Sequence, residues 1–193
     1  QGERELLLAF AEVMRSLSGQ ILIDGKPVSI NSPAAARRDG VGMDRDKERL
    51  FQRTVDLNGR RLGSYGKAGA RFGLIHCDLR LANLLFDGPS VKVIDFDDCG
   101  FGWYMYDAAT PVSFYEHEPQ VPGLIESWKE GYRRVLPLPK EDETEIPTFI
   151  MLRRILLVAW IASHIEADYP RSLGAGFTEG TLPLCEEYLR KFG

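Results

Sequence analysis

The sequence predicts an α+β fold that is mostly helical and carries small β-hairpins. Apolar residues recur every three to four positions over most of the C-terminal half. Short β-prone runs flank the turn dipeptides Asp24-Gly25 and Asp87-Gly88. With 193 residues, 44% of them hydrophobic and 27% charged, the chain can also bury a core without disulfides or metals.

The first forty residues are expected to contain a helix, a hairpin and a second, shorter helix. The first helix has its apolar residues on one face and ends at Ser18-Gly19. Gly25 supplies the positive φ that a tight hairpin turn requires. The expected elements are a helix over 5–17, strands over 21–23 and 28–30, and a helix over 33–38.

The remaining elements are separated by glycine-rich and proline-rich segments. A glycine-rich, basic connector over 63–73 follows a charged helix, and the acidic run 141–145 is expected to be a solvated loop. The expected elements are a helix over 44–62, a strand over 74–76, a hairpin of 84–86 with 91–96, and helices over 124–135, 146–168 and 183–192.

Composition and charge exclude several classes of protein. The net charge of −4 argues against a nucleic-acid binder. Three cysteines without a CxxC pair or a Cys/His cluster predict neither a disulfide framework nor a zinc site. No secretory signal is visible, and the apolar stretch 155–165 is about half the length that crosses a bilayer. We therefore predict a cytoplasmic protein with neither nucleic acid nor membrane as a partner.

Two polar segments carry the chemistry. His76-Cys77-Asp78-Leu79-Arg80-Leu81-Ala82-Asn83 fits the pattern H-x-D-L-x-x-x-N, and Asp95-Phe96-Asp97 follows one hairpin later. Phosphoryl transfer from MgATP needs a carboxylate that accepts the proton of the attacking hydroxyl, and oxygen ligands that hold magnesium on the phosphates. Asp78, Asn83 and Asp95 can supply these groups. Asp97 and Asp98 are expected to be solvated or to brace their loop.

The segment LIHCDLRLANLLFDGPSVKVIDFDDCGFGWYMYDAA resembles the aminoglycoside phosphotransferase and choline kinase family, whose members are relatives of protein kinases. The resemblance extends over about 44–193 and implies the C-terminal lobe of a kinase-like fold. The family transfers the γ-phosphate of ATP, with Mg²⁺, to a hydroxyl of a small molecule. Cys77 and Asp97 depart from the protein-kinase pattern toward the small-molecule branch.

Carried over to this sequence, the resemblance implies a role for each of five residues. Asp78 would be the catalytic base, and Asn83 and Asp95 would be magnesium ligands. His76 and Asp107 would support the site structurally. No nucleotide-binding residue can be assigned, because neither a glycine-rich loop nor a strand Lys paired with a helix Glu is recognisable before His76.

The N-terminal segment has a different resemblance. GERELLLAFAEVMRSLSGQILIDGKPVSINSPAAARRDGVGM, residues 2–43, is similar to part of the ATP-binding domain of sugar or nucleoside ABC importers. The part with the P-loop is absent, so no ATP site can be carried over. We therefore predict two units, an ABC-ATPase-like fragment over 1–43 and a phosphotransferase lobe over 44–193.

Three functions remain open at this point. In the first, the chain is a small-molecule kinase, and residues 1–62 or a partner must take the place of the missing nucleotide lobe for it to be active. In the second, it is a non-catalytic kinase-like remnant or an interaction module. In the third, the chain is a fragment of transport machinery, but its sequence shows no Walker A motif, no Walker B motif and no true ABC signature. Residues 76–193 carry 11 Lys and Arg against 19 Asp and Glu, a charge of −8, which favours a cationic acceptor. No pattern indicates an oligomeric state.

Overall fold

The computed structural model describes residues 22–23, 26–27, 45–88 and 90–193. The helices expected over 5–17 and 33–38 and the strand expected over 28–30 lie outside these residues. The described elements in chain order are β1 (Leu22–Ile23), β2 (Lys26–Pro27), α2 (Arg45–Tyr65), β3 (Phe72–Ile75), η2 (Leu81–Asn83), β4 (Leu84–Asp87), β5 (Ser90–Val93), β6 (Gly100–Trp103), α3 (Tyr106–Ala109), η3 (Thr110–Val112), α4 (Val121–Arg133), α5 (Lys140–Ser163), α6 (Asp168–Glu179) and α7 (Leu182–Phe192).

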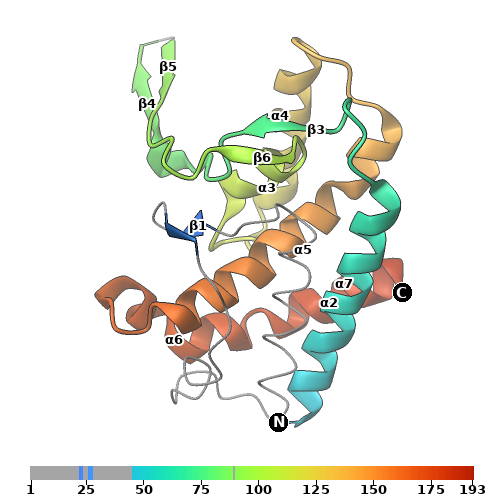
Figure 1. The fold of residues 1–193 in the computed structure, drawn as a ribbon, viewed down its shortest axis with the longest axis vertical. Coiled ribbons are helices and arrows are strands. Elements are labelled where there is room, and N and C mark those ends of the chain that lie inside the picture. The colour runs from blue at the N-terminus through green and yellow to red at the C-terminus, as the bar shows by residue number, and fades with distance from the viewer. Residues whose placement is uncertain (1–21, 24–25, 28–44, 89) are drawn as a thin grey trace.

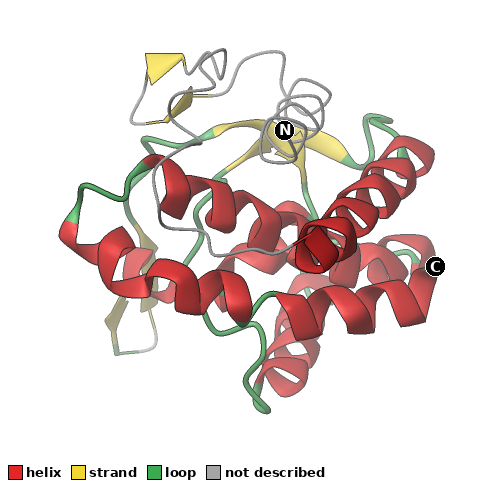
Figure 2. Cartoon of the chain, turned by 90° about the horizontal axis from the view of Figure 1, so that it is seen from below, coloured by secondary structure: helices red, strands yellow, loops and turns green. Residues whose placement is uncertain are grey.

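Helices make up most of the described protein (Figures 1 and 2). The long helices α2 and α5 pack on each other, and α7 packs on α2. The larger core cluster joins side chains from these helices and from α6: Phe51, Val55, Leu57, Met151, Ile155, Leu157, Val158, Ile161, Phe177, Cys185 and Tyr188. Helix α2 ends three residues beyond the expected limit, where Gly66 adopts a φ of 73° and its N–H bonds the carbonyl of Leu62. The mostly helical α+β prediction is confirmed.

Helix α5 begins earlier and ends earlier than expected. The acidic run 141–145 lies in the first two turns of the helix and not in a solvated loop, because acidic side chains are favoured at the positive end of a helix. Asp142 is buried there and accepts hydrogen bonds from Tyr65 Oη and Arg71 Nε, both at 2.8 Å. The helix ends at Ser163, a turn follows over 164–167, and α6, which was not expected from the sequence, begins at Asp168. Among the described helices, α5 alone passes a length and hydropathy test for a membrane span, but 56% of its apolar window is buried within the protein.

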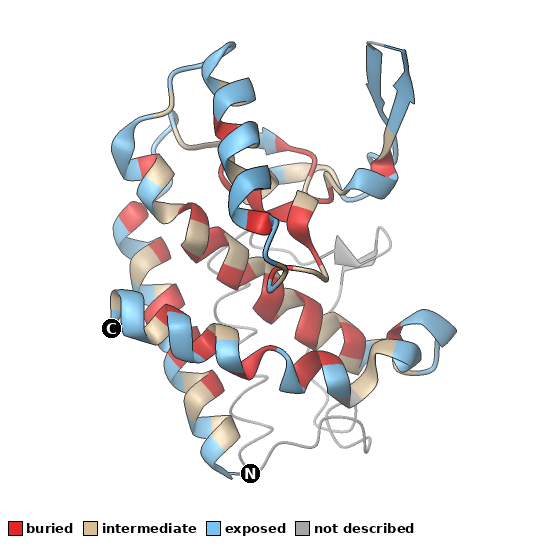
Figure 3. Ribbon diagram, turned by 180° about the vertical axis from the view of Figure 1, so that it is seen from behind, coloured by how far each residue is buried: buried red, intermediate tan, exposed pale blue. Residues whose placement is uncertain are grey.

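Three antiparallel strand pairs complete the described structure: β1 with β2, β3 with β6, and β4 with β5. Strand β6 was not expected from the sequence, and β5 ends at Val93 instead of residue 96. Gly102 permits the close pairing of β6 with β3, because a Cβ there would lie 2.4 Å from Ile75 Cδ1. The β4–β5 hairpin projects from the body, and most of its residues are exposed (Figure 3).

A buried ion pair joins α5 to the segment before α4. Arg154 Nη1 donates to Glu116 Oε2 at 2.6 Å, and the two side chains are only 2% and 1% exposed. The same guanidinium donates to Thr181 Oγ1 and to the carbonyl of Phe177. Arg154 therefore ties three segments together inside the helical core.

Arg154→Leu is expected to lower the free energy of unfolding by about 3–5 kcal/mol, because Glu116 would remain buried without its partner. Urea denaturation measures this loss. The matched control is Arg133→Leu, because the Arg133 side chain is 43% exposed and pairs with Glu143. Its loss of unfolding free energy should be about 0–1 kcal/mol. Equal losses in the two variants would contradict the assignment of Arg154 to the core.

Candidate active site

The two polar segments form adjoining loops. The first loop leaves β3 at His76 and ends at η2, and the second follows β5. Cys77 and Asp95 have φ angles of 69° and 64°, a region that residues other than glycine enter at a cost and that is enriched at functional sites. These two residues are the points at which the chain turns from each strand into its loop.

Asp107 anchors the first loop. Its Oδ2 accepts the backbone N–H of His76 at 2.8 Å, and its Oδ1 accepts that of Cys77 at 2.9 Å. Burial raises the pKa of Asp107, while the two backbone N–H groups and the neighbouring His76 and Arg153 oppose that rise. One carboxylate on α3 thus satisfies two consecutive amides where β3 ends.

His76 connects the two loops. Its Nδ1 accepts the N–H of Asp78 at 3.3 Å, so the ring proton is on Nε2, which donates to the carbonyl of Ile94 at 3.0 Å. The N–H of Ile94 in turn bonds the carbonyl of Asn83 at 3.0 Å. The His76 ring also lies 4.8 Å from the ring of Phe96, between centroids. These contacts place Asp95, the residue after Ile94, beside the first loop.

Asp78 lies at the centre of a network of donors. Its side chain is 11% exposed. Oδ1 accepts from Arg153 Nη2 at 2.5 Å, Arg80 Nε lies 2.9 Å from both carboxylate oxygens, and Asn83 Nδ2 donates to Oδ2 at 3.1 Å. The carboxylate predicted to be the base therefore lies against two guanidinium groups and an amide.

Arg80 and Arg153 were not among the residues predicted for the site. Arg80 lies two positions after Asp78, within the motif itself, so its proximity was readable from the sequence. Arg153 lies on α5, 75 positions away, and no sequence signal connects it to the loop. Burial lowers the pKa of Arg153, but Tyr106 and Asp78 raise it more, so the net shift is upward and the guanidinium stays charged.

Asn83 and Asp95 have the chemistry of ligands for a hard cation. Asn83 directs Nδ2 to the carbonyl and carboxylate of Asp78, which leaves Oδ1 as the amide atom that can bind a metal. The Asp95 side chain is exposed and makes no hydrogen bond with the described part of the chain. Two oxygen ligands suit Mg²⁺, which keeps waters and phosphate oxygens for its remaining positions. The described residues hold no group of three or more His, Cys, Asp or Glu suited to a metal.

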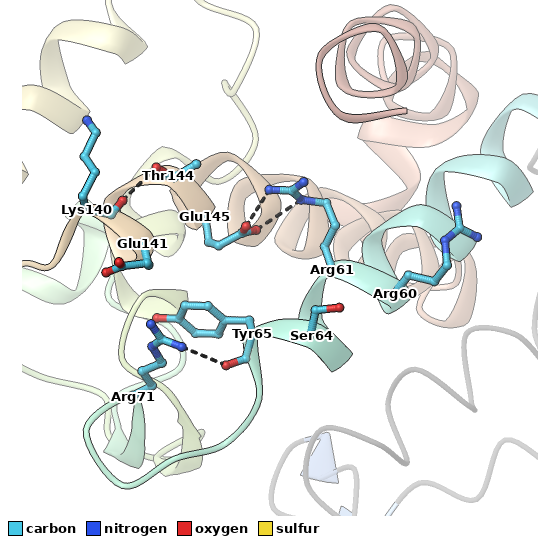
Figure 4. A pocket seen from close by; sticks show the side chains of 9 residues that line it. All are labelled: Arg60, Arg61, Ser64, Tyr65, Arg71, Lys140, Glu141, Thr144 and Glu145. Atoms are coloured by element: carbon cyan, nitrogen blue, oxygen red, sulfur yellow. Dashed lines mark hydrogen bonds and ion pairs between the residues drawn. The ribbon is translucent and has the colours of Figure 1, made fainter.

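A hollow of about 530 Å³ lies away from these loops, between the C-terminal end of α2 and the N-terminal end of α5 (Figure 4). Two of its basic side chains are engaged with neighbouring groups. Arg61 Nη2 pairs with Glu145 at 2.5 Å, and Arg71 Nη1 donates to the carbonyl of Tyr65 at 3.2 Å. We interpret the hollow as a charged contact between helices and assign no catalytic role to it.

Cys77 is expected to be an unreactive thiol. Burial, and second the charge of Asp107, raise its pKa to about 12. At pH 8 the reactive thiolate fraction is then lower by about 10³-fold than for a thiol of ordinary pKa. Iodoacetamide labelling followed by peptide mass spectrometry should show correspondingly slow alkylation of Cys77 in the folded protein and ordinary alkylation in urea. Equal rates in the two states would contradict the raised pKa of this thiol.

The helical lobe with small antiparallel strand pairs, beside which two polar loops meet, has a kinase-like fold, as its likeness to solved kinase structures shows. The sequence profile of the phosphotransferase enzyme family, APH, matches residues 31–138, more than half of the chain. The chain belongs to this family. The resemblance seen in the segment from Leu74 to Ala109 is thereby confirmed.

Solved structures agree with this assignment. The microcompartment-associated aminopropanol kinase has a TM-score of 0.75 and 44% identity, over 86% of this chain and 52% of that one. The amicoumacin kinase hAmiN, solved with AMP-PNP, Ca²⁺ and Ami, has a TM-score of 0.58 and 22% identity, over 98% of this chain and 59% of that one. The second likeness shows the fold. The chain therefore spans between half and three fifths of the length of these two kinases.

The second resemblance is confirmed as well. The ribose import ATP-binding protein RbsA 1 of Mesorhizobium japonicum is 72% identical over 43 residues, which are 22% of this chain and 8% of that protein. The chain therefore joins a short segment similar to a sugar importer ATPase to a lobe of the phosphotransferase family.

Proposed function

We propose that the protein transfers the γ-phosphate of ATP to a hydroxyl group of a small molecule, with Asp78 as the base. The observation that carries this proposal is the meeting of Asp78, Asn83 and Asp95 on two adjoining loops. The His76 side chain joins these loops to each other. The same residues are those that the family motif implies for phosphoryl transfer.

In the proposed reaction, Asp78 orients the acceptor hydroxyl and takes its proton as the oxygen attacks the γ-phosphorus. The bond between the γ-phosphorus and the bridging oxygen breaks, and ADP leaves with that oxygen. Asn83 and Asp95 would hold Mg²⁺, which neutralises phosphate charge when bound. Asp107 keeps the first loop in place by accepting the backbone N–H groups of His76 and Cys77, and the His76 ring does so by accepting the N–H of Asp78.

The surface beside these loops supports the proposal that a second lobe covers the nucleotide. Leu74 on β3 and Phe101 on β6 form a cross-strand pair and are 65% and 70% exposed. Phe86, which is 68% exposed, and Val91 form another pair on the β4–β5 hairpin. Large apolar side chains exposed together on neighbouring strands are typical of an interaction surface. Residues 45–62 cannot form that lobe, because helix α2 is packed against α5 and α7.

Calorimetry with MgATP and MgADP tests nucleotide binding directly. Binding that requires Mg²⁺ and is abolished in Asp95→Ala supports the proposed site. The matched control is Asp97→Ala in the same exposed loop, which should bind as the natural chain does. No binding at millimolar nucleotide would exclude the kinase function for this chain and would leave the interaction module.

We propose an amino alcohol as the acceptor class. The similar aminopropanol kinase supports this choice through its name and its 44% identity. The charge of −8 over residues 76–193 supports it independently, because an acidic surface attracts cations. We also propose a cytoplasmic location and the boundary between residues 43 and 44, both from the sequence.

Acceptor preference is tested by comparing 1-amino-2-propanol with 1,2-propanediol at two ionic strengths. We expect a higher kcat/KM for the amine and a decline with added salt, because salt screens long-range attraction. Equal turnover of the two alcohols with no effect of salt would exclude the electrostatic preference.

A further inference from the structure

The Asp78 carboxylate is held by three side-chain N–H donors. Arg153 Nη2 donates to Oδ1, Asn83 Nδ2 donates to Oδ2, and the single N–H of Arg80 Nε is shared between the two oxygens. A carboxylate has about four lone-pair sites. An acceptor hydroxyl therefore has about one lone-pair site of Asp78 open to it, and more room where one of these donors moves away.

The three donors differ in how firmly they are held. Asn83 is buried, and its Nδ2 also donates to the carbonyl of Asp78 at 2.9 Å. The Arg80 side chain is 33% exposed, and its hydrogen bonds go to Asp78 alone, with the ring of Phe114 at 5.8 Å as its other contact. Arg80 is therefore the donor that can be exchanged for the acceptor.

Arg153 is held from several directions. Its side chain is 13% exposed. Nε donates to Ser113 Oγ at 3.0 Å, and Nη1 lies 3.2 Å from Tyr106 Oη and 3.5 Å from the carbonyl of Cys77. These contacts leave Nη2 directed at Asp78 and bring together α5, α3, the segment after η3 and the first loop. A planar guanidinium with so many partners has one orientation.

We propose that Arg153 is the positioning residue of Asp78, which keeps the carboxylate oriented toward the acceptor while Arg80 is exchanged. The inference rests on the proposed function, in which Asp78 is the base. Arg153 acts through Asp78 and touches neither the nucleotide nor the acceptor. Its removal should therefore affect the chemical step and leave both binding steps intact.

The test compares Arg153→Met and Arg153→Lys with Arg61→Met. Arg61 is a matched control, because its partly buried guanidinium also pairs with a carboxylate, Glu145, at a contact between α2 and α5. We expect Arg153→Met to lower kcat by about 30-fold or more, with little change in the acceptor KM or in nucleotide affinity. Arg153→Lys should recover part of kcat, and Arg61→Met should keep kcat at a comparable loss of melting temperature.

A kcat for Arg153→Met within threefold of that of the natural chain would overturn the inference. If Arg153→Met does not fold, the same comparison is made with Arg153→Lys. A lowered kcat with unchanged nucleotide affinity in Arg153→Lys then supports the inference, and an unchanged kcat overturns it. A kcat that falls equally in Arg61→Met would also overturn it, because the effect would then be one of stability.

A second readout is independent of turnover. A water-soluble carbodiimide with a glycine ester labels accessible carboxyl groups, and peptide mass spectrometry quantifies labelling at Asp78. We expect labelling of Asp78 to rise about tenfold in Arg153→Met and to stay unchanged in Arg61→Met, since losing one charge-assisted hydrogen bond frees the carboxylate. If the natural chain shows no turnover, the proposed function fails, and the labelling experiment alone then tests whether Arg153 positions the Asp78 carboxylate. Equal labelling of Asp78 in all chains would overturn the role of Arg153.

Discussion

Replacing Asp78 with asparagine is expected to lower the rate of phosphoryl transfer by about 10²-fold to 10⁴-fold, the range typical of losing a positioned base. An amide cannot accept the proton of the acceptor hydroxyl at neutral pH. Nucleotide affinity should change little, because Asp78 is proposed to act on the acceptor. The measurement combines steady-state kinetics with MgATP calorimetry on the same preparation.

Stability must be followed in the same variant. Asparagine keeps one acceptor oxygen, but its amide would face donors from Arg80, Arg153 or Asn83, so a lower melting temperature is expected. Asp97→Asn is the control, since Asp97 is exposed in the neighbouring loop and should keep its rate. An unchanged rate in Asp78→Asn would remove Asp78 from the role of base.

Local sequence patterns were sufficient for α2, α4, α7, the middle of α5 and the two loops, whereas α3 and α6 were not expected. Leu50, Phe51, Val55 and Leu62 recur at helical spacing, and their spacing decides which face of α2 is buried. The motif from His76 to Asn83 lies within one loop, so its residues are neighbours whatever surrounds them. A single hairpin separates Asp95 from that loop, and a short connection leaves few possible arrangements.

Features that depend on distant contacts could not be predicted in this way. Strand β6 reads Gly-Phe-Gly-Trp, a poor strand sequence, and it is extended because it pairs with β3. The break between α5 and α6 interrupts a pattern that remains apolar on both sides. Arg153 in the sequence is only a charge beside an apolar run, and its contact with Asp78 depends on how α5 is rotated against the first loop.

Replacing Asp107 with asparagine is expected to destabilise the protein by about 1–3 kcal/mol and to lower the rate together with stability. The carboxylate accepts the N–H groups of His76 and Cys77 on separate oxygens, whereas the amide has one oxygen. One buried backbone donor would therefore lose its partner, at about that cost. Urea denaturation measures the loss, and Asp87→Asn on the exposed β4–β5 hairpin is the control.

The loss of unfolding free energy in Asp107→Asn is expected to depend on pH. Burial raises the pKa of Asp107 in the folded protein, so the ionised form is disfavoured there relative to the unfolded chain. The contribution of Asp107 to stability is therefore complete below the ordinary pKa of an aspartate and declines as pH rises through the folded pKa. Asparagine does not titrate. The difference in unfolding free energy between the natural chain and Asp107→Asn should narrow as pH rises, and a difference that widens would show that the two backbone donors outweigh burial at this carboxylate.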